Sequence, residues 1–179
     1  MPLAHYFCEK RKARKGEAMD VLWAPWRMEY ILCEKGKGCI FCTKLAEQND
    51  EKNLILYRGK TAFIIMNFYP YNNGHLMVVP NRHTANLADL SEVERLELMT
   101  LMRNGVAALQ TTISPHGFNI GMNLGKVAGA GVDDHLHFHI VPRWEGDTNY
   151  MPIVGHTKVV SEGLQETWQR LKAVLGKKV

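Results

Sequence analysis

Three histidines alternate with apolar residues late in the chain, at His135, His137 and His139. Side chains of a β-strand point alternately to its two faces, so this spacing predicts three imidazoles on one face, with successive members about 6.5–7 Å apart. An imidazole with an unperturbed pKa of about 6.5 suits proton transfer, nucleophilic attack or metal binding. The alternative is a solvated strand that happens to be rich in histidine. Because three of the eight histidines fall within five residues, we favour a reactive cluster.

A glycine-rich segment runs from Gly125 to Gly131, shortly before the histidine cluster. Small residues allow backbone N–H groups to converge on an anion. Such segments are also common as flexible hairpin connections. Next to the imidazoles, this segment indicates phosphoryl chemistry, in which a neutral imidazole attacks phosphorus and forms a covalent phosphoramidate.

A second group of candidate ligands begins with the Cys-x-x-Cys pair Cys39 and Cys42. Two thiolates with two imidazoles, for which His83 and His135 are candidates, would close a tetrahedral structural zinc site. The alternatives are a thioredoxin-like redox pair or two ordinary thiols. A redox pair would follow a strand and sit at an exposed helix N-terminus, and no preceding strand is evident. We therefore favour zinc.

The elements that position these residues are predicted to form a mostly antiparallel sheet. Runs of apolar and β-branched residues bounded by turn signals predict five strands, over residues 54–57, 62–66, 75–79, 118–122 and 136–141. Hairpin-length connections join the early strands. The order β-β-β-α-β-β indicates an α+β domain.

Three helices complete this prediction. A short helix follows Cys39, and an amphipathic helix near the C-terminus stops at Gly176. The clearest helix begins after Ser91, where Glu94 completes a capping box, and cannot continue past Pro115. Apolar residues at helical spacing predict the face of this helix that packs into the core: Leu96, Met99, Met102, Val106, Leu109 and Ile113.

Composition narrows the function classes. The chain has 179 residues and a net charge of +4, which suits one domain with extensions. Part of the positive charge lies in residues 9–15 and reads as a solvated tail; no aromatic residues interleave with it, so no specific nucleic-acid binding is expected. No apolar run approaches the roughly 20 residues of a membrane span, and no secretory signal is evident. We expect a cytoplasmic protein with reduced cysteines.

The segment from His135 to Val141 resembles the signature of the histidine triad (HIT) family, His-φ-His-φ-His-φ-φ with φ apolar. The segments 39–42, 74–80 and 82–83 resemble earlier blocks of the family, in family order. The resemblance covers about Trp23 to Trp144, and segments 23–27 and 142–149 look like a bacterial branch associated with diadenosine polyphosphate phosphorylase or hydrolase activity. It implies a HIT-like fold, with a mostly antiparallel five-stranded sheet, two main helices and a sheet extended across a homodimer.

The resemblance also implies roles for the histidines. His137 would attack the α-phosphorus of a nucleotide, while His139 and the more distant His75 would hydrogen-bond phosphate oxygens and help protonate the leaving group. His135 would orient His137 through its main chain and complete the zinc site with Cys39, Cys42 and His83.

Further positions would bind substrate. Asn67 falls where the family contacts ribose hydroxyls, and an asparagine there mildly favours the dinucleoside polyphosphate branch. Asn123 falls where a side-chain amide approaches the phosphates. The apolar base pocket would be formed by residues for which plain core packing is the alternative: Ile40, Phe41, Ile65 and Phe68.

One departure from the family concerns the residues just before the triad. Many members carry a hydroxyl or amide residue there, whereas this chain has Ala130 and Gly131 followed by Val132, Asp133 and Asp134. This segment is one residue longer than in the simpler members. Backbone N–H groups of Ala130 and Gly131 would take over the donor role. The two aspartates would repel a phosphate unless they point away or hydrogen-bond an imidazole.

These features predict an enzyme that transfers a nucleotidyl group through a His137 intermediate to phosphate or water, with diadenosine tetraphosphate, accompanied by Mg²⁺, as the best-matching substrate. The alternatives are a hydrolase of nucleoside phosphoramidates, such as AMP linked to an amine, and a non-enzymatic nucleotide-binding protein. The expected assembly is a homodimer, or a tetramer if Trp23, Trp26 and the C-terminal helix make further contacts.

The predicted domain organisation has three parts. Residues 1–20 form a basic N-terminal extension, with Met19 as an alternative start, residues 21–150 form the HIT domain, and residues 151–179 form a C-terminal extension with the amphipathic helix.

Overall fold

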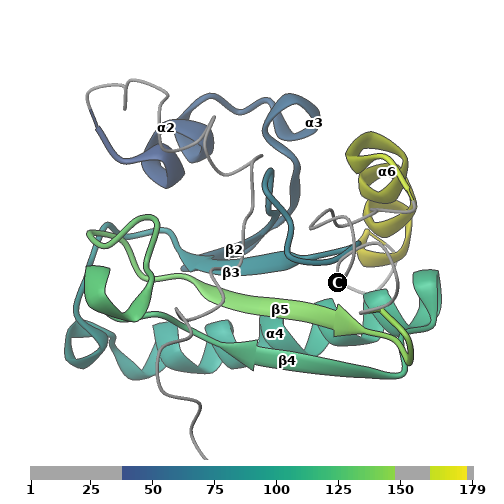
Figure 1. The fold of residues 1–179 in the computed structure, drawn as a ribbon. Coiled ribbons are helices and arrows are strands. Elements are labelled where there is room, and N and C mark those ends of the chain that lie inside the picture. The colour runs from purple at the N-terminus through teal and green to yellow at the C-terminus, as the bar shows by residue number, and fades with distance from the viewer. Residues whose placement is uncertain (1–37, 148–161, 177–179) are drawn as a thin grey trace, which may run out of the picture.

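The computed structural model describes residues 38–147 and 162–176. At its centre is a five-stranded antiparallel sheet in the order β1-β2-β3-β5-β4 (Figure 1). The strands are β1 (Ile55–Arg58), β2 (Ala62–Met66), β3 (Leu76–Pro80), β4 (Gly117–Gly121) and β5 (Phe138–Arg143). The predicted α+β class, the strand order along the chain and the antiparallel pairing are confirmed.

Helices cover both faces of this sheet (Figure 1). The long helix α4 (Glu92–Ile113) and the C-terminal helix α6 (Leu164–Leu175) pack on one face and share the larger hydrophobic core with β1, β2, β3 and β5. The short helix α2 (Ile40–Ala46) covers the other face, where Phe41 packs with Ile55, Phe63 and Ile65. The remaining short elements are α3 (Asp50–Asn53) and two 3-10 turns, η1 (Leu87–Asp89) and η2 (Lys126–Ala128).

Helix α4 begins as the sequence predicts. The Ser91 hydroxyl accepts from the backbone N–H of Glu94, and the Glu94 carboxylate accepts from the backbone N–H of Ser91 at 2.8 Å. Arg82 donates to both oxygens of the same carboxylate, at 3.0 Å each, which with the capping bond lowers the pKa of Glu94 to about 2. Helix α4 thus starts at a fixed point relative to the loop that follows β3.

The predicted buried face of α4 is wrong in its first half. Leu96 and Met99 are 71% and 63% exposed, whereas the side that faces the sheet runs through Leu98, Leu101, Met102, Gly105 and Ala108. The reason is close packing, because a Cβ added at Gly105 would lie only 3.1 Å from Cδ1 of Ile140. The centre of the interface requires small residues, so a stripe drawn through the large apolar ones is rotated away from it.

The turn between β2 and β3 is held against the end of α4. Gly74 has a φ of +70°, and a Cβ there would lie 2.6 Å from Cδ1 of Ile113. The buried Asn72 side chain donates to the carbonyl of Pro142 and to the Asp147 carboxylate, both at 2.9 Å. The turn therefore brings the next residue, His75, to a fixed position at the start of β3.

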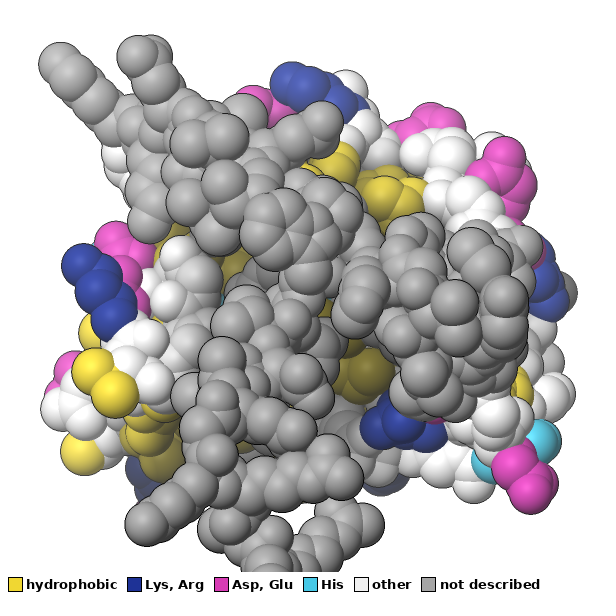
Figure 2. All heavy atoms as spheres, viewed as in Figure 1, with side chains coloured by type: hydrophobic (Ala, Val, Ile, Leu, Met, Phe, Trp, Pro, Cys, Tyr) yellow, Lys and Arg dark blue, Asp and Glu magenta, His cyan; other side chains and the backbone are white. Residues whose placement is uncertain are grey.

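In the described part of the chain, no helix has the length and apolar character needed to cross a membrane. On the face seen in Figure 2, the visible acidic and basic side chains of the described residues are interspersed. The predicted extension over residues 1–20, Met19, Trp23 and Trp26 lie outside the described residues. The division at residues 20 and 150 stays a prediction.

Candidate functional site

A pocket opens between α2 and the face of the sheet on which α2 packs. Its walls include His137 and His139 together with many of the predicted substrate-binding residues: Ile40, Phe41, Ile65, Asn67, Phe68 and Gly131. Residues that sequence reasoning missed also line it, among them Lys44, Tyr71 and Met77. Lys44 follows Ile40 by four residues on a helix, so its place on the same face was available from spacing. Tyr71 lies in an irregular turn, and no sequence pattern pointed to it.

His137 is held by the backbone of its own segment. Its Nδ1 lies 2.9 Å from the main-chain oxygen of His135, which has no proton to donate, so the ring donates from Nδ1. The neutral ring then carries its lone pair on Nε2. The side chain is 5% exposed and its ring centroid lies 5.2 Å from that of Phe41. Burial lowers the pKa of His137, which favours the neutral imidazole that a nucleophile requires.

The strand predicted over residues 136–141 begins at Phe138 in the structure, so His139 is the member of the triad that lies within β5. The alternation of faces nevertheless continues through the preceding residues. The His137 ring centroid lies 4.9 Å from that of His139, and the Phe41 ring contacts both His135 and His137. On the opposite side, Leu136 and Ile140 belong to the core beneath α4.

His75 lies behind His139 and is not part of the pocket wall. Its side chain is fully buried, its Nδ1 accepts from the backbone N–H of Tyr71 at 3.1 Å, and its Nε2 lies 2.9 Å from Nδ1 of His139. Nε2 of His75 is therefore the donor, and the neutral His139 ring keeps its proton on its own Nε2. Burial, followed by the neighbouring His139 and His137, lowers the pKa of His75 to about 3.

Asn67 makes local hydrogen bonds in the same turn. Its Oδ1 accepts from the backbone N–H of Tyr69 at 2.9 Å, and its Nδ2 lies 3.3 Å from Nδ1 of His75. The side chain lines the pocket while it supports the His75 ring.

Two of the predicted phosphate-binding residues lie beside the pocket rather than in its wall. Nδ2 of Asn123 donates to the carbonyl of Gly129 at 3.4 Å, and Gly129 itself lines the pocket. The backbone N–H of Ala130 donates to the carbonyl of Gly125 at 3.4 Å. In this structure the Ala130 donor therefore closes the glycine-rich loop, and Gly131 is the residue of this pair that reaches the pocket.

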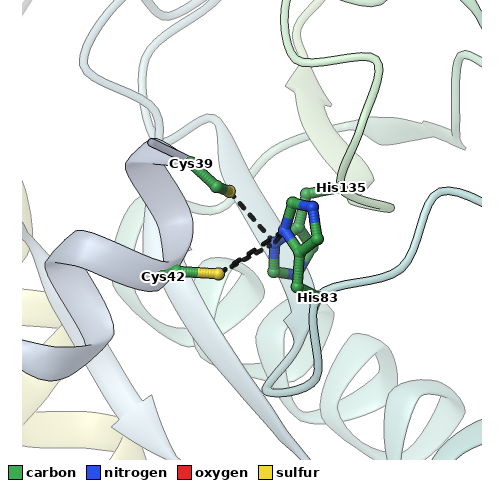
Figure 3. Close-up of side chains that lie close together, drawn as sticks. All are labelled: Cys39, Cys42, His83 and His135. Carbon is green, nitrogen blue, oxygen red and sulfur yellow. Dashed lines mark hydrogen bonds between the residues drawn. The ribbon is translucent and has the colours of Figure 1, made fainter. Parts of the chain in front are cut away.

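The second predicted group of ligands comes together at the N-terminal end of α2 (Figure 3). Cys39 and Cys42 point from this helix towards two imidazoles that come from separate segments, His83 after β3 and His135 before β5. One ligand atom from each of the four residues lies within 4.8 Å of all the others. Sγ of Cys39 is 3.2 Å and Sγ of Cys42 is 3.7 Å from Nδ1 of His135.

These four residues fit a zinc ion. Nε2 of His135 lies 2.9 Å from the carbonyl of Pro80 and therefore carries the proton, so the lone pair of its Nδ1 faces the thiols. Nδ1 of His83 is only 3.3 Å from this atom. Two ring nitrogens and two thiol sulfurs that converge in this way could hold a metal ion. A Cys₂His₂ donor set is typical of tetrahedral structural zinc.

The two aspartates before the triad have partners of their own. Oδ2 of Asp134 lies 3.9 Å from Nε2 of His83, on the side of the ring away from the thiols, and Asp133 pairs with Lys126 at 3.6 Å. Neither aspartate is among the residues that line the pocket. The two aspartates therefore do not face the pocket, where their charge would repel a phosphate.

The fold and the site, with alternating histidines beside a pocket and a Cys₂His₂ cluster next to them, are those expected of a histidine triad domain. The chain belongs to the HIT domain family, whose model matches residues 48–146.

Named relatives and a solved structure agree with this assignment. The AP-4-A phosphorylase of Mycobacterium tuberculosis is 40% identical over 84% of this chain and 82% of that protein. The adenosine 5'-monophosphoramidase hnt1 of Schizosaccharomyces pombe is 31% identical over 65% of this chain and 75% of that protein. The crystal structure of a Zn-bound histidine triad family protein from Mycobacterium smegmatis has a TM-score of 0.64 and 25% identity, over 78% of this chain and 94% of that one.

Proposed function

We propose that this protein is an enzyme that cleaves dinucleoside polyphosphates by transferring a nucleotidyl group through His137. The observation that carries the proposal is the tautomer of His137. With Nδ1 donating to the carbonyl of His135, the nucleophilic lone pair is on Nε2 in a residue that lines the pocket. The 40% identity to a protein named AP-4-A phosphorylase supports diadenosine tetraphosphate as a substrate.

In the first step, Nε2 of His137 attacks the α-phosphorus, and the bond from this phosphorus to the bridging oxygen breaks. With diadenosine tetraphosphate, the products of this step are adenylyl-His137 and ATP. His139 lines the same pocket and is held by His75 in the tautomer with a proton on Nε2, so we propose that it hydrogen-bonds the leaving oxygen. His75 would act only through His139, as a positioning residue.

In the second step, an acceptor attacks the same phosphorus and the bond to His137 breaks. Inorganic phosphate as the acceptor yields ADP, and water yields AMP. We propose that the backbone of Gly131 and the amides of Asn123 and Asn67 contact the phosphates and ribose, and that Mg²⁺ enters with the polyphosphate as part of the substrate. Ile40, Phe41, Ile65 and Phe68 would form the apolar walls for the base.

We also propose that Cys39, Cys42, His83 and His135 hold a structural zinc ion. When bound, zinc would supply a cross-link between α2 and the two segments that follow β3 and precede β5. Because His135 also orients His137, the proposed metal site supports the position of the nucleophile.

The experiment is product analysis in ¹⁸O-water, with and without phosphate, for the wild type, His137→Asn and the control His116→Asn, which changes an exposed histidine outside the pocket. We expect ADP with ATP only when phosphate is present if the acceptor is phosphate. AMP carrying one ¹⁸O, together with ATP, would identify water as the acceptor. His137→Asn should abolish both. Undiminished turnover by His137→Asn would contradict the proposal.

Phosphoramidate hydrolysis is a second candidate, favoured by the 31% identity to a protein named adenosine 5'-monophosphoramidase. The nucleophile is the same and only the leaving group differs. A higher kcat/KM for an AMP–amine conjugate than for diadenosine tetraphosphate would make this the principal activity. Tight nucleotide binding with no turnover of either compound would favour the binding-protein alternative.

We propose a homodimer formed along β4, consistent with the predicted extension of the sheet. β4 is an edge strand, its Ile120 is 51% exposed, and α4 adds the exposed Leu96 and Met99. Unpaired edges with apolar side chains favour pairing with a second copy. Light scattering after size-exclusion chromatography should give twice the chain mass, and Ile120→Lys should reduce it. A cytoplasmic location stays a prediction.

A further inference from the structure

Lys44 is the one lysine that lines the pocket with His137 and His139 in the described part of the chain. It lies on α2, four residues after Ile40, and its Nζ stands 3.5 Å from the centre of the Phe68 ring. Phe68 also lines a second pocket, between α3 and the start of α6, which neither His137 nor His139 lines. Lys44 and Phe68 therefore mark the end of the pocket that leads away from the nucleophile.

The ammonium group of Lys44 has no hydrogen bond or ion pair to any described residue. Glu47 acts on it only at longer range. The Lys44 side chain is half-buried. The contact of the Lys44 ammonium group with the aromatic face of Phe68 is an attraction to its charge and is not a directional hydrogen bond from its N–H groups. A half-buried cation whose donors are open to solvent in a pocket wall is available to a ligand that supplies acceptors.

The end of the pocket that holds Lys44 is apolar apart from this lysine, with Ile40 and Phe68 beside it. Such walls suit a flat nucleobase, while a phosphate would have to leave its water for a largely apolar surface. With the α-phosphorus at His137, the base lies at the far end of the pocket. Lys44 is thus placed against the edge of a base rather than against the phosphates.

We propose that Lys44 is a specificity-determining residue that donates to acceptor atoms on the edge of the nucleobase and favours guanine over adenine. Lysine has donors and no acceptor. Guanine presents O6 and N7, both acceptors, on one edge, whereas adenine presents N7 beside its N6 amino group, a donor that a lysine repels. The inference rests on the proposed function and predicts that, among dinucleoside polyphosphates, those that contain a 6-oxopurine are the better substrates.

The test compares diguanosine tetraphosphate with diadenosine tetraphosphate for the wild type, Lys44→Met and Lys44→Arg. Met keeps the length of the side chain without donors, and Arg keeps the donors. We expect the wild type to favour the guanine substrate about tenfold in kcat/KM, Lys44→Met to show a ratio near one, and Lys44→Arg to retain the preference. Binding of GMP and AMP, measured by calorimetry, should show the same ratios of Kd.

Equal guanine-to-adenine ratios in the wild type and Lys44→Met would overturn the inference. If kcat/KM then falls in parallel with both substrates, Lys44 contacts a phosphate instead. If neither dinucleotide is turned over, the proposed function fails while the ratio of Kd values for GMP and AMP still decides the role of Lys44.

Discussion

The main-chain oxygen of His135 accepts a hydrogen bond from Nδ1 of His137 at 2.9 Å. The same residue turns its own Nδ1 towards Cys39 at 3.2 Å and donates from Nε2 to the carbonyl of Pro80. One residue therefore joins the candidate metal cluster, the end of β3 and the candidate nucleophile. The ring of His135 belongs to the candidate metal cluster, and its main-chain oxygen orients His137. The metal cluster and the candidate nucleophile are therefore linked through one residue.

The first prediction concerns the pH dependence of turnover. The reactive form of His137 is the neutral ring, and burial lowers the pKa of His137 below its ordinary value of 6.5. Protonation therefore begins only at lower pH, and kcat/KM for the dinucleotide should stay on a plateau from neutral pH to below 6.5 before it falls. Steady-state rates between pH 4.5 and 8, with the far-UV circular dichroism recorded at each pH to show that the protein is folded, measure this. The His116→Asn control should give the same profile, and an acid limb centred at or above 6.5 would contradict the prediction.

The second prediction concerns stability and rests on His75. Its pKa is about 3 in the folded protein and about 6.5 in an unfolded chain, so between these values only the unfolded chain binds the proton. The contribution of His75 is fully present above pH 6.5 and is lost as the pH falls towards 3. The free energy of unfolding should fall by about 1.4 kcal/mol per pH unit for this one proton in that window. Urea unfolding of the wild type at several pH values measures the slope.

His75→Gln and His116→Gln form a matched pair for this measurement. The His75→Gln substitution should reduce the number of protons taken up on unfolding by about one, and so flatten the dependence of the free energy of unfolding on pH. The substitution of the exposed His116 should leave this dependence unchanged. Identical slopes in the wild type and His75→Gln would show that His75 does not carry the linkage.

The features of this site that depend on residues near one another in the sequence could be predicted, whereas those that depend on contacts between distant segments could not. The alternation of histidines with apolar residues around His137 determines which side chains share a face, because it is a local property of an extended chain. It holds even before β5 begins at Phe138. The four cluster residues were found by their chemistry, since thiols and imidazoles have few other reasons to gather.

Long-range packing explains what sequence reasoning missed. The buried side of α4 depends on how closely Gly105 approaches Ile140 across the core, and no periodicity within the helix contains that distance. The burial of His75 behind His139 depends on the β3–β5 register, in which Met77 pairs with His139. Lys44 was missed although its spacing from Ile40 was visible, because a lysine on a short helix is ordinarily exposed to solvent and the pocket beside it forms only in the fold.

The third prediction separates the two aspartates before the triad. Asp134 lies 3.9 Å from Nε2 of His83, where a carboxylate would strengthen the ring as a metal ligand, and Asp133 pairs with Lys126 instead. Asp134→Asn should weaken zinc binding by about tenfold. Asp133→Asn should have little effect. Competition with a chromogenic chelator measures the affinity, and the zinc content by elemental analysis should approach one ion per chain in the wild type. Equal affinities for the two variants would exclude this role for Asp134.

The fourth prediction concerns the turn that delivers His75. Gly74 and Gly146 both have positive φ, +70° and +76°, but a Cβ at Gly74 would meet Ile113 at 2.6 Å and Leu109 at 2.9 Å, whereas at Gly146 nothing lies within 4 Å. Gly146→Ala should therefore cost only the backbone strain, about 1 kcal/mol, and Gly74→Ala should add an overpacking cost, for a total of about 2–4 kcal/mol.

Urea unfolding at neutral pH measures both glycine variants. Because relief of the clash would move the residue that holds His139, Gly74→Ala should also lower kcat, and Gly146→Ala should not. Equal destabilisation by the two substitutions would mean that the end of α4 yields to the added methyl group. In that case the position of His75 would depend on its hydrogen bonds to Tyr71 and His139 rather than on the packing of the turn.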